Sequence, residues 1–154
     1  MKPYPDTNFL TRLYLALPDS EKADQLLEQA KTGSVAALPV TWLHRVETVN
    51  AFQLSVFVGG LSGQTRVTAE QAASALAGFR EDIRTSVFFR AAPLSLEKLE
   101  HEFEELALRH TAKHGFRTYD LLHVASALVL ECDTFWSFDP KASKLAQLEG
   151  MNTR

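Results

Sequence analysis

The sequence has very little cysteine and no long apolar run, and both shortages narrow the class of protein. Its single cysteine, Cys132, cannot form a disulfide within the chain. The longest nearly apolar stretch, residues 121–130, contains His123 and is far shorter than the roughly 20 residues of a membrane-spanning helix. The start, MKPYPDTNFL, lacks the basic segment and apolar stretch of a secretory signal. We therefore expect a cytoplasmic protein without a membrane span.

The chain also lacks an excess of positive charge. It carries 16 Lys and Arg against 19 Asp and Glu, a formal charge of −3. This balance excludes a protein that binds nucleic acid through its overall charge, so any such site must be local. A local site is physically reasonable, because a bound divalent cation reverses the field around acidic groups and clustered arginines can still bind phosphates.

Repeats and low-complexity tracts are absent as well, and what remains is typical of a globular domain. The 154 residues are 45% hydrophobic and 23% charged, which favours one folded domain spanning residues 1–154. Short apolar runs alternate with segments of helical periodicity. This alternation predicts an α/β fold in which helices cover both faces of a parallel sheet.

Local signals place the individual elements. Strands are expected at residues 2–5, 35–40, 87–92 and 134–138, the first weakened by two prolines. Helices are expected from Asn8 up to Pro18, at 20–31, after Thr41, at 68–84, 95–110 and 119–131, and from Pro140 to Gly150. Several residues provide helix caps or turns: Thr41 and Thr118 as N-caps, Thr68 with Gln71 as a capping box, Gly115 as a C-cap, and Gly59, Gly60 and Gly63 as a turn.

Four acidic residues occupy positions where a carboxylate can serve chemistry. Asp6 and Asp139 follow predicted strands, where the ligands of open α/β sheets bind. Asp120 begins an apolar helix, and Glu47 lies on or beside the apolar stripe of its helix, so it should face inward. A buried carboxylate must be protonated, paired with a base, or bound to a metal.

Metal binding would give these four acids a common purpose. Carboxylates without thiolates suit Mg²⁺ or Mn²⁺, and such a site can activate water to hydrolyse the phosphodiesters of RNA or DNA. Each acid also has a purely structural interpretation. Asp6 and Asp139 can be N-caps, Asp120 can interact with a helix dipole, and Glu47 can pair with Arg45 or Arg117. Helix capping does not explain an inward-facing glutamate, so the structural interpretation is weaker for the four acids together than for each acid alone.

Four segments together carry a family resemblance: PDTNFL near the start, LHRVETVNAF, RTYDLLHVASAL, and TFWSFDPKASKLA near the end. In this order and spacing, the chain resembles the PIN-domain ribonucleases, and in particular the VapC-like toxins of bacterial toxin–antitoxin pairs. The resemblance spans nearly the whole chain.

The resemblance implies a three-layer fold with parallel strand order 3-2-1-4-5, a Mg²⁺ or Mn²⁺ site and endonucleolytic cleavage of RNA. It also implies frequent homodimers and inhibition by an antitoxin peptide. Asp6, Glu47, Asp120 and Asp139 match the family's acidic set. Asn8 and Ser137 match polar positions that support the metal and its waters. The chain departs from the family in its proline-rich first strand and in a last strand, after Gly150, that is short or missing.

Other residues and rival functions complete the expectations. His123 can contact a phosphate or orient an acid, although a core hydrogen bond is the simpler role, and Arg117 is the arginine best placed to bind RNA. The strand phenylalanines belong to the core, whereas Trp42 and Trp136 fit either the core or base stacking. The rival functions are a PIN-like module that binds RNA without cutting it and a phosphohydrolase with Asp6 as nucleophile. Asn8 argues against the second, because that chemistry uses a second aspartate there.

Overall fold

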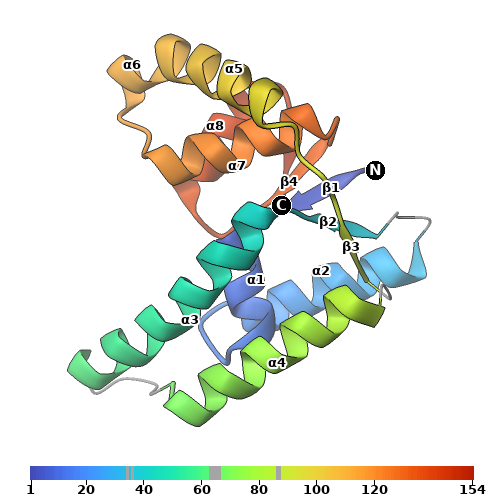
Figure 1. Ribbon diagram of the computed structural model, residues 1–154, viewed down its shortest axis with the longest axis vertical. Helices are drawn as coiled ribbons and strands as arrows, with labels where there is room; N and C mark the ends of the chain where they lie inside the picture. Colours follow the sequence, from blue (N-terminus) through green and yellow to red (C-terminus); the bar gives the residue numbers. More distant parts are fainter. Residues whose placement is uncertain (34, 36, 63–66, 86–87) are drawn as a thin grey trace.

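The computed structural model describes residues 1–33, 35, 37–62, 67–85 and 88–154. Short strands lie between two groups of helices, α1–α4 on one side and α5–α8 on the other (Figure 1). The strands are β1 (Pro3–Pro5), β2 (Leu38–Val40), β3 (Phe89–Ala91), β4 (Thr134–Trp136) and β5 (Asn152–Thr153). The helical segments are α1 (Thr7–Tyr14), α2 (Ser20–Thr32), α3 (Trp42–Ser62), α4 (Ala69–Thr85), α5 (Leu96–Leu106), the π-helical turn η1 (Ala107–Thr111), α6 (Ala112–His114), α7 (Thr118–Val129) and α8 (Pro140–Leu148). The predicted α/β class and its three layers are confirmed.

All described strand pairs are parallel, but they form two separate ladders, β1-β4-β5 and β2-β3. β2 lies next to β1, so the order across the layer is the predicted 3-2-1-4-5 with a break between β2 and β1. The N–H of Asp6 donates to the carbonyl oxygen of Trp136 in β4. Because consecutive backbone N–H groups of a strand point toward opposite neighbouring strands, the donors toward β2 would come from Pro3 and Pro5, which have no N–H. The prolines thus explain the break.

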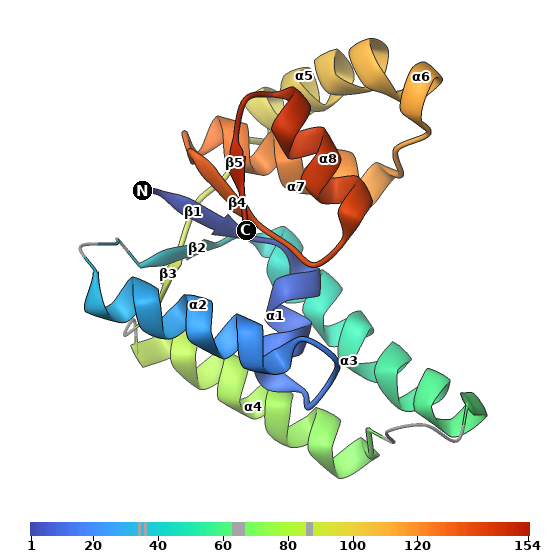
Figure 2. The ribbon, with the colours of Figure 1, turned by 180° about the vertical axis from the view of Figure 1, so that it is seen from behind.

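The last strand is present but short. β5 contains two residues, and Asn152 and Thr153 pair with Thr134 and Phe135 of β4. The positive φ of Gly150, 80°, lets the chain turn out of α8 and return to the sheet edge, where Figure 2 shows β5 beside β4. The doubt that the sequence raised about this strand is therefore resolved in favour of an abbreviated strand.

The two faces of the sheet carry separate hydrophobic cores. Neighbouring residues of β4 point in opposite directions: Phe135 packs with Tyr4 and the α5, α7 and α8 side, and Trp136 packs with Phe9 and the α1–α2 side. Trp136 is 1% exposed and so belongs to the core, whereas Trp42 is 40% exposed. A third cluster, around Phe52, joins α3 to α1 and α4.

Three local predictions are wrong. Gly59 and Gly60 do not form a turn but lie inside α3, which continues to Ser62, while Gly63 lies outside the described residues. Glycine in a helix costs only about 1 kcal/mol relative to alanine, and the packing of α3 on α1 and α4 outweighs it. The N-cap of α7 is Arg117 rather than Thr118, and α1 ends at Tyr14 before Pro18 is reached.

Other local predictions are confirmed. Asp139 caps α8 ahead of Pro140, and Gly115 ends α6 with a φ of 66°. The predicted strands at 35–40 and 87–92 contain β2 and β3, but residues 36 and 87 lie outside the described part. No helix in the described ranges combines the length and apolar character needed to span a membrane.

Candidate metal and phosphodiester site

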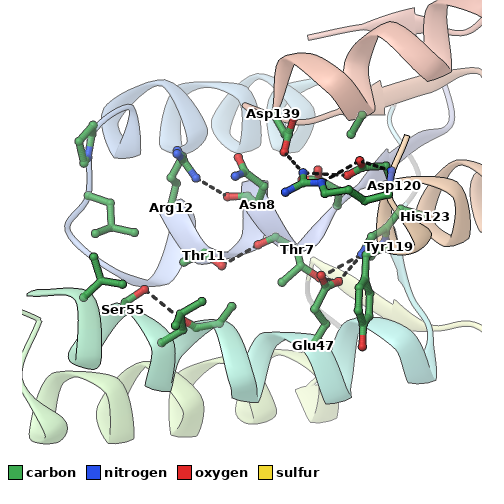
Figure 3. A pocket seen from close by; sticks show the side chains of 18 of the residues that line it. Thr7, Asn8, Thr11, Arg12, Glu47, Ser55, Tyr119, Asp120, His123 and Asp139 are labelled. Atoms are coloured by element: carbon green, nitrogen blue, oxygen red, sulfur yellow. Dashed lines mark hydrogen bonds and ion pairs between the residues drawn. The ribbon is translucent and has the colours of Figure 1, made fainter. Parts of the chain in front are cut away.

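A cavity of about 630 Å³ opens where β1 and β4 end and runs between α1 and α3. All four predicted acids line it, and they come from four different elements: Asp6 before α1, Glu47 from α3, Asp120 from α7 and Asp139 before α8. Figure 3 shows Glu47, Asp120 and Asp139 with their partners at one end of this cavity. The fold therefore brings together carboxylates that are up to 133 positions apart (139 − 6) in the sequence.

Asp6 is both a helix cap and a buried acid. One carboxylate oxygen accepts the N–H of Phe9, which caps α1, and the other accepts the hydroxyl of Ser137. Asp6 is 4% exposed, and this burial raises its pKa from 3.8 to about 6, although the charge of His123 and the two hydrogen bonds counteract the rise. Ser137, which was predicted as a supporting residue, therefore donates a hydrogen bond to one of the four acids.

Glu47 is held by two side chains from other elements. Its Oε2 accepts hydrogen bonds from the Thr7 hydroxyl, at 2.7 Å, and from Nε2 of His123. Burial alone would raise the pKa of Glu47, but the hydrogen bond and charge of His123, with help from Thr7 and Arg117, hold it below its usual value. The predicted pairing of Glu47 with Arg45 is not what the structure shows.

His123 connects Glu47 to the core. Its Nδ1 lies 3.0 Å from the hydroxyl of Tyr4, and burial raises the pKa of Tyr4 so that the hydroxyl keeps its proton. Nε2 of His123 lies within hydrogen-bond distance of Oε2 of Glu47, so a proton on Nε2 points to this acid. The core hydrogen bond expected of His123 and its role in orienting an acid are thus the same interaction. Thr7 and Tyr4 were missed by sequence reasoning, since neither type of residue signals a site.

Arg117 connects the other two acids. Its Nε and Nη2 each lie 3.1 Å from an oxygen of Asp120, and Nη2 lies 2.6 Å from Oδ2 of Asp139. The carboxylate of Asp120 also accepts the backbone N–H of Arg117, which closes the first turn of α7. These bonds raise the pKa of Arg117, chiefly through Asp120, so the guanidinium stays charged.

Asn8 and Arg12 lie further along the cavity on α1. Oδ1 of Asn8 is buried and accepts no hydrogen bond from the residues that the structure describes. The guanidinium of Arg12 donates to the carbonyl oxygen of Asn8 and lies over the ring of Phe138. Among the arginines that the structure describes, Arg12 and Arg117 line the cavity.

The chemistry of this donor set fits a hard divalent cation. Four carboxylates share one cavity with a buried amide oxygen that lacks a hydrogen-bond donor, and all are oxygen ligands of the kind that Mg²⁺ and Mn²⁺ prefer. In the described part of the chain, however, no three His, Cys, Asp or Glu side chains are gathered closely enough to hold an ion. The guanidinium of Arg117 already binds oxygens of Asp120 and Asp139. The acids fit a cation in kind and in location, and Arg117 competes for two of them.

Comparison with known proteins places this geometry in a family. The model of the PIN domain family matches residues 4–148. None of the curated proteins matches the sequence significantly. Solved structures match along nearly their whole length. VapBC2 from Rickettsia felis, bound to a DNA fragment from its promoter, has a TM-score of 0.66 at 17% identity, with 100% of this chain and 98% of that chain covered. The sarcin-ricin loop cleaving toxin VapC20 from Mycobacterium tuberculosis has a TM-score of 0.62 at 18% identity, with 93% and 94% covered. FitAcB from Neisseria gonorrhoeae has a TM-score of 0.61 at 15% identity, with 98% and 95% covered. The TM-scores show a shared fold, and at identities this low the matches show the fold alone.

Proposed function

Because the chain belongs to the PIN-domain family, we propose that it is an endoribonuclease that hydrolyses RNA phosphodiesters with Mg²⁺ or Mn²⁺. The observation that carries the proposal is that Asp6, Glu47, Asp120 and Asp139 line one cavity at the ends of β1 and β4. A structural role explains each acid separately, but it does not explain why four carboxylates should converge in one open cavity, where they repel one another.

The same four acids are the residues that would hold the cation. When bound, the cation supplies Lewis acidity and neutralises charge that builds up on the phosphate. The chain's own residues orient the acids: Ser137 holds an oxygen of Asp6, and Thr7 and His123 hold Oε2 of Glu47. These hydrogen bonds leave the carboxylates charged and restrict their rotation, which preorganises the site.

The family and the similar structures support two partners, an RNA substrate and an antitoxin. A VapC20 described as cleaving the sarcin-ricin loop supports RNA as the substrate class, and the VapBC2 structure supports an antitoxin as protein partner. The protein would then act in the cytoplasm as the toxin of a toxin–antitoxin pair, and a homodimer is its expected assembly.

Cleavage of total cellular RNA by the purified, antitoxin-free protein tests the activity. We expect discrete fragments with Mg²⁺ or Mn²⁺, and no fragments with a chelator or with Asp6→Asn. Asp19→Asn is the matched control, because Asp19 does not line the cavity and its side chain pairs with Lys22 at the surface, so this variant should cut like the wild type. Intact RNA with every metal, from folded protein that still binds RNA, would favour the non-cleaving binding module instead.

A further inference from the structure

Arg117 makes an unusual set of contacts for an exposed arginine. Its side chain is 63% exposed, yet two nitrogens of the guanidinium donate to Asp120. One of them also donates to Asp139, which precedes α8. The two acids lie at the beginnings of different helices, 19 residues apart (139 − 120). Arg117 therefore joins two elements of the site, because it binds an acid of α7 and the acid that precedes α8.

The charges lining the cavity show why this position matters. Four acids and two arginines, Arg12 and Arg117, line it. Arg12 donates to a backbone carbonyl and lies over Phe138, so it is directed away from the acids. Arg117 thus supplies the positive charge that bonds directly to Asp120 and Asp139, two of the acids proposed to hold the cation.

The local backbone allows Arg117 to leave. Arg117 is the N-cap of α7 with extended φ and ψ values of −86° and 157°, so its side chain is not part of the helix body. The carboxylate of Asp120 would still accept the backbone N–H of Arg117 after the guanidinium had turned away. Water also screens ion pairs made by an exposed side chain, so these contacts are breakable.

We propose that Arg117 exchanges partners during the reaction: its guanidinium neutralises Asp120 and Asp139 until a divalent cation takes their oxygens, and then it binds a phosphate of the RNA. The inference rests on the proposed function. An arginine suits both roles, because carboxylate and phosphate present similar paired oxygens to the planar guanidinium. The exchange would also change the local electrostatic potential from negative to positive, because the released guanidinium and the bound metal ion together attract the anionic RNA.

Metal binding without RNA tests the first half of the exchange. Isothermal titration calorimetry with Mn²⁺ should show that Arg117→Gln binds the ion roughly three- to tenfold more tightly than the wild type, because a competitor for two ligands has been removed. Arg84→Gln is the matched control, since Arg84 makes the same two-nitrogen contact with Glu81, three residues away, on the exposed face of α4. That variant should bind Mn²⁺ like the wild type.

RNA kinetics at saturating Mn²⁺ test the second half. Arg117→Gln should raise KM more than it lowers kcat, and it should reduce the slope of log KM against log salt by about one, the value for one lost phosphate contact. Arg117→Lys should recover most of the lost RNA affinity, because it restores the charge. Arg84→Gln should leave both constants unchanged.

Several outcomes would overturn the exchange. Equal Mn²⁺ affinity in the Arg117→Gln and Arg84→Gln variants would show that Arg117 does not compete with the ion, and weaker affinity in Arg117→Gln would show that it holds the acids in place for the metal. Unchanged KM and salt dependence would remove its role at the phosphate. If Arg117→Gln binds Mn²⁺ more tightly but the wild-type protein cuts no RNA, the nuclease function is refuted. The competition between Arg117 and the ion for the acids would then still stand.

Discussion

Replacing Asp6 with asparagine should make the metal-free protein more stable while it removes the proposed activity. Asp6 is 4% exposed, and burial is the main reason that its pKa rises from 3.8 to about 6. At neutral pH the folded protein must therefore carry a carboxylate that its surroundings disfavour. Asparagine keeps the oxygen that accepts the N–H of Phe9, and the hydroxyl of Ser137 can rotate to accept from the new amide.

The sign and size of the effect follow from the pKa. The folded-state pKa lies above the ordinary value, so the contribution of Asp6 to stability is fully present below pH 3.8 and is lost as the pH rises through 6. A difference of about 2 pKa units corresponds to about 3 kcal/mol at pH 7.5. The neutral asparagine accepts weaker hydrogen bonds than the carboxylate, which offsets part of this free energy. We therefore expect Asp6→Asn to raise the free energy of unfolding by about 1–3 kcal/mol, or the Tm by roughly 3–10 °C for a chain of this size.

Thermal unfolding in the presence of a chelator measures the gain at pH 7.5 and at pH 4.5. The advantage of Asp6→Asn should be large at the higher pH and should shrink at the lower one, where Asp6 is already protonated. Asp19→Asn controls for a carboxylate outside the cavity. Equal Tm values at pH 7.5, or an advantage of the same size at both pH values, would refute the assignment of the cost to the buried charge. Added Mn²⁺ should raise the Tm of the wild type more than that of Asp6→Asn.

Three further changes test other parts of the structure. Burial lowers the pKa of His44 from 6.5 to about 3, so its contribution to stability is present above pH 6.5 and is lost as the pH falls, by about 1.4 kcal/mol per pH unit. Urea unfolding between pH 6.5 and 4.5 should show this slope in the Asp6→Asn variant. In the wild type, the opposite pH dependence of Asp6 offsets it. Gly115→Ala should cost about 1 kcal/mol in urea unfolding because of its φ of 66°, although a Cβ there would contact nothing within 4 Å. Gly60→Ala, inside α3 and equally free of contacts, should instead stabilise by up to about 1 kcal/mol, and a loss there would contradict the helical assignment.

The parts of the fold that depend on neighbouring residues could be predicted from the sequence. The capping box of Thr68 and Gln71 and the cap at Asp139 are built from contacts within three positions, and the structure shows them as expected. Gly59 and Gly60 were misread as a turn because their local preference opposes the helix, whereas the packing of α3 against α1 and α4, which a local pattern does not contain, decides the outcome.

The acids of the candidate site were predictable for a similar reason, but their partners were not. Asp6 and Asp139 could be placed from strand ends, and Glu47 from its helical stripe. The bond from His123 to Glu47 joins residues 76 positions apart, and its geometry depends on how α7 packs beside β1 and α3. The bridge from Arg117 to Asp139 depends on a side-chain rotamer as well, which no spacing in the sequence encodes.

For Asp6 and Asp139, the structural and chemical interpretations, which seemed to be alternatives in the sequence, use different oxygens of the same carboxylate. One oxygen of Asp139 accepts the N–H of Lys141 and caps α8, while the other accepts a hydrogen bond from the guanidinium of Arg117. Asp6 likewise caps α1 through one oxygen and meets a rotatable hydroxyl through the other. A helix cap aims the carboxylate and limits its rotation at almost no cost to its remaining lone pairs. Capping would therefore preorganise Asp6 and Asp139 for the proposed cation, and a variant that removes metal binding need not unfold the helix that its carboxylate caps.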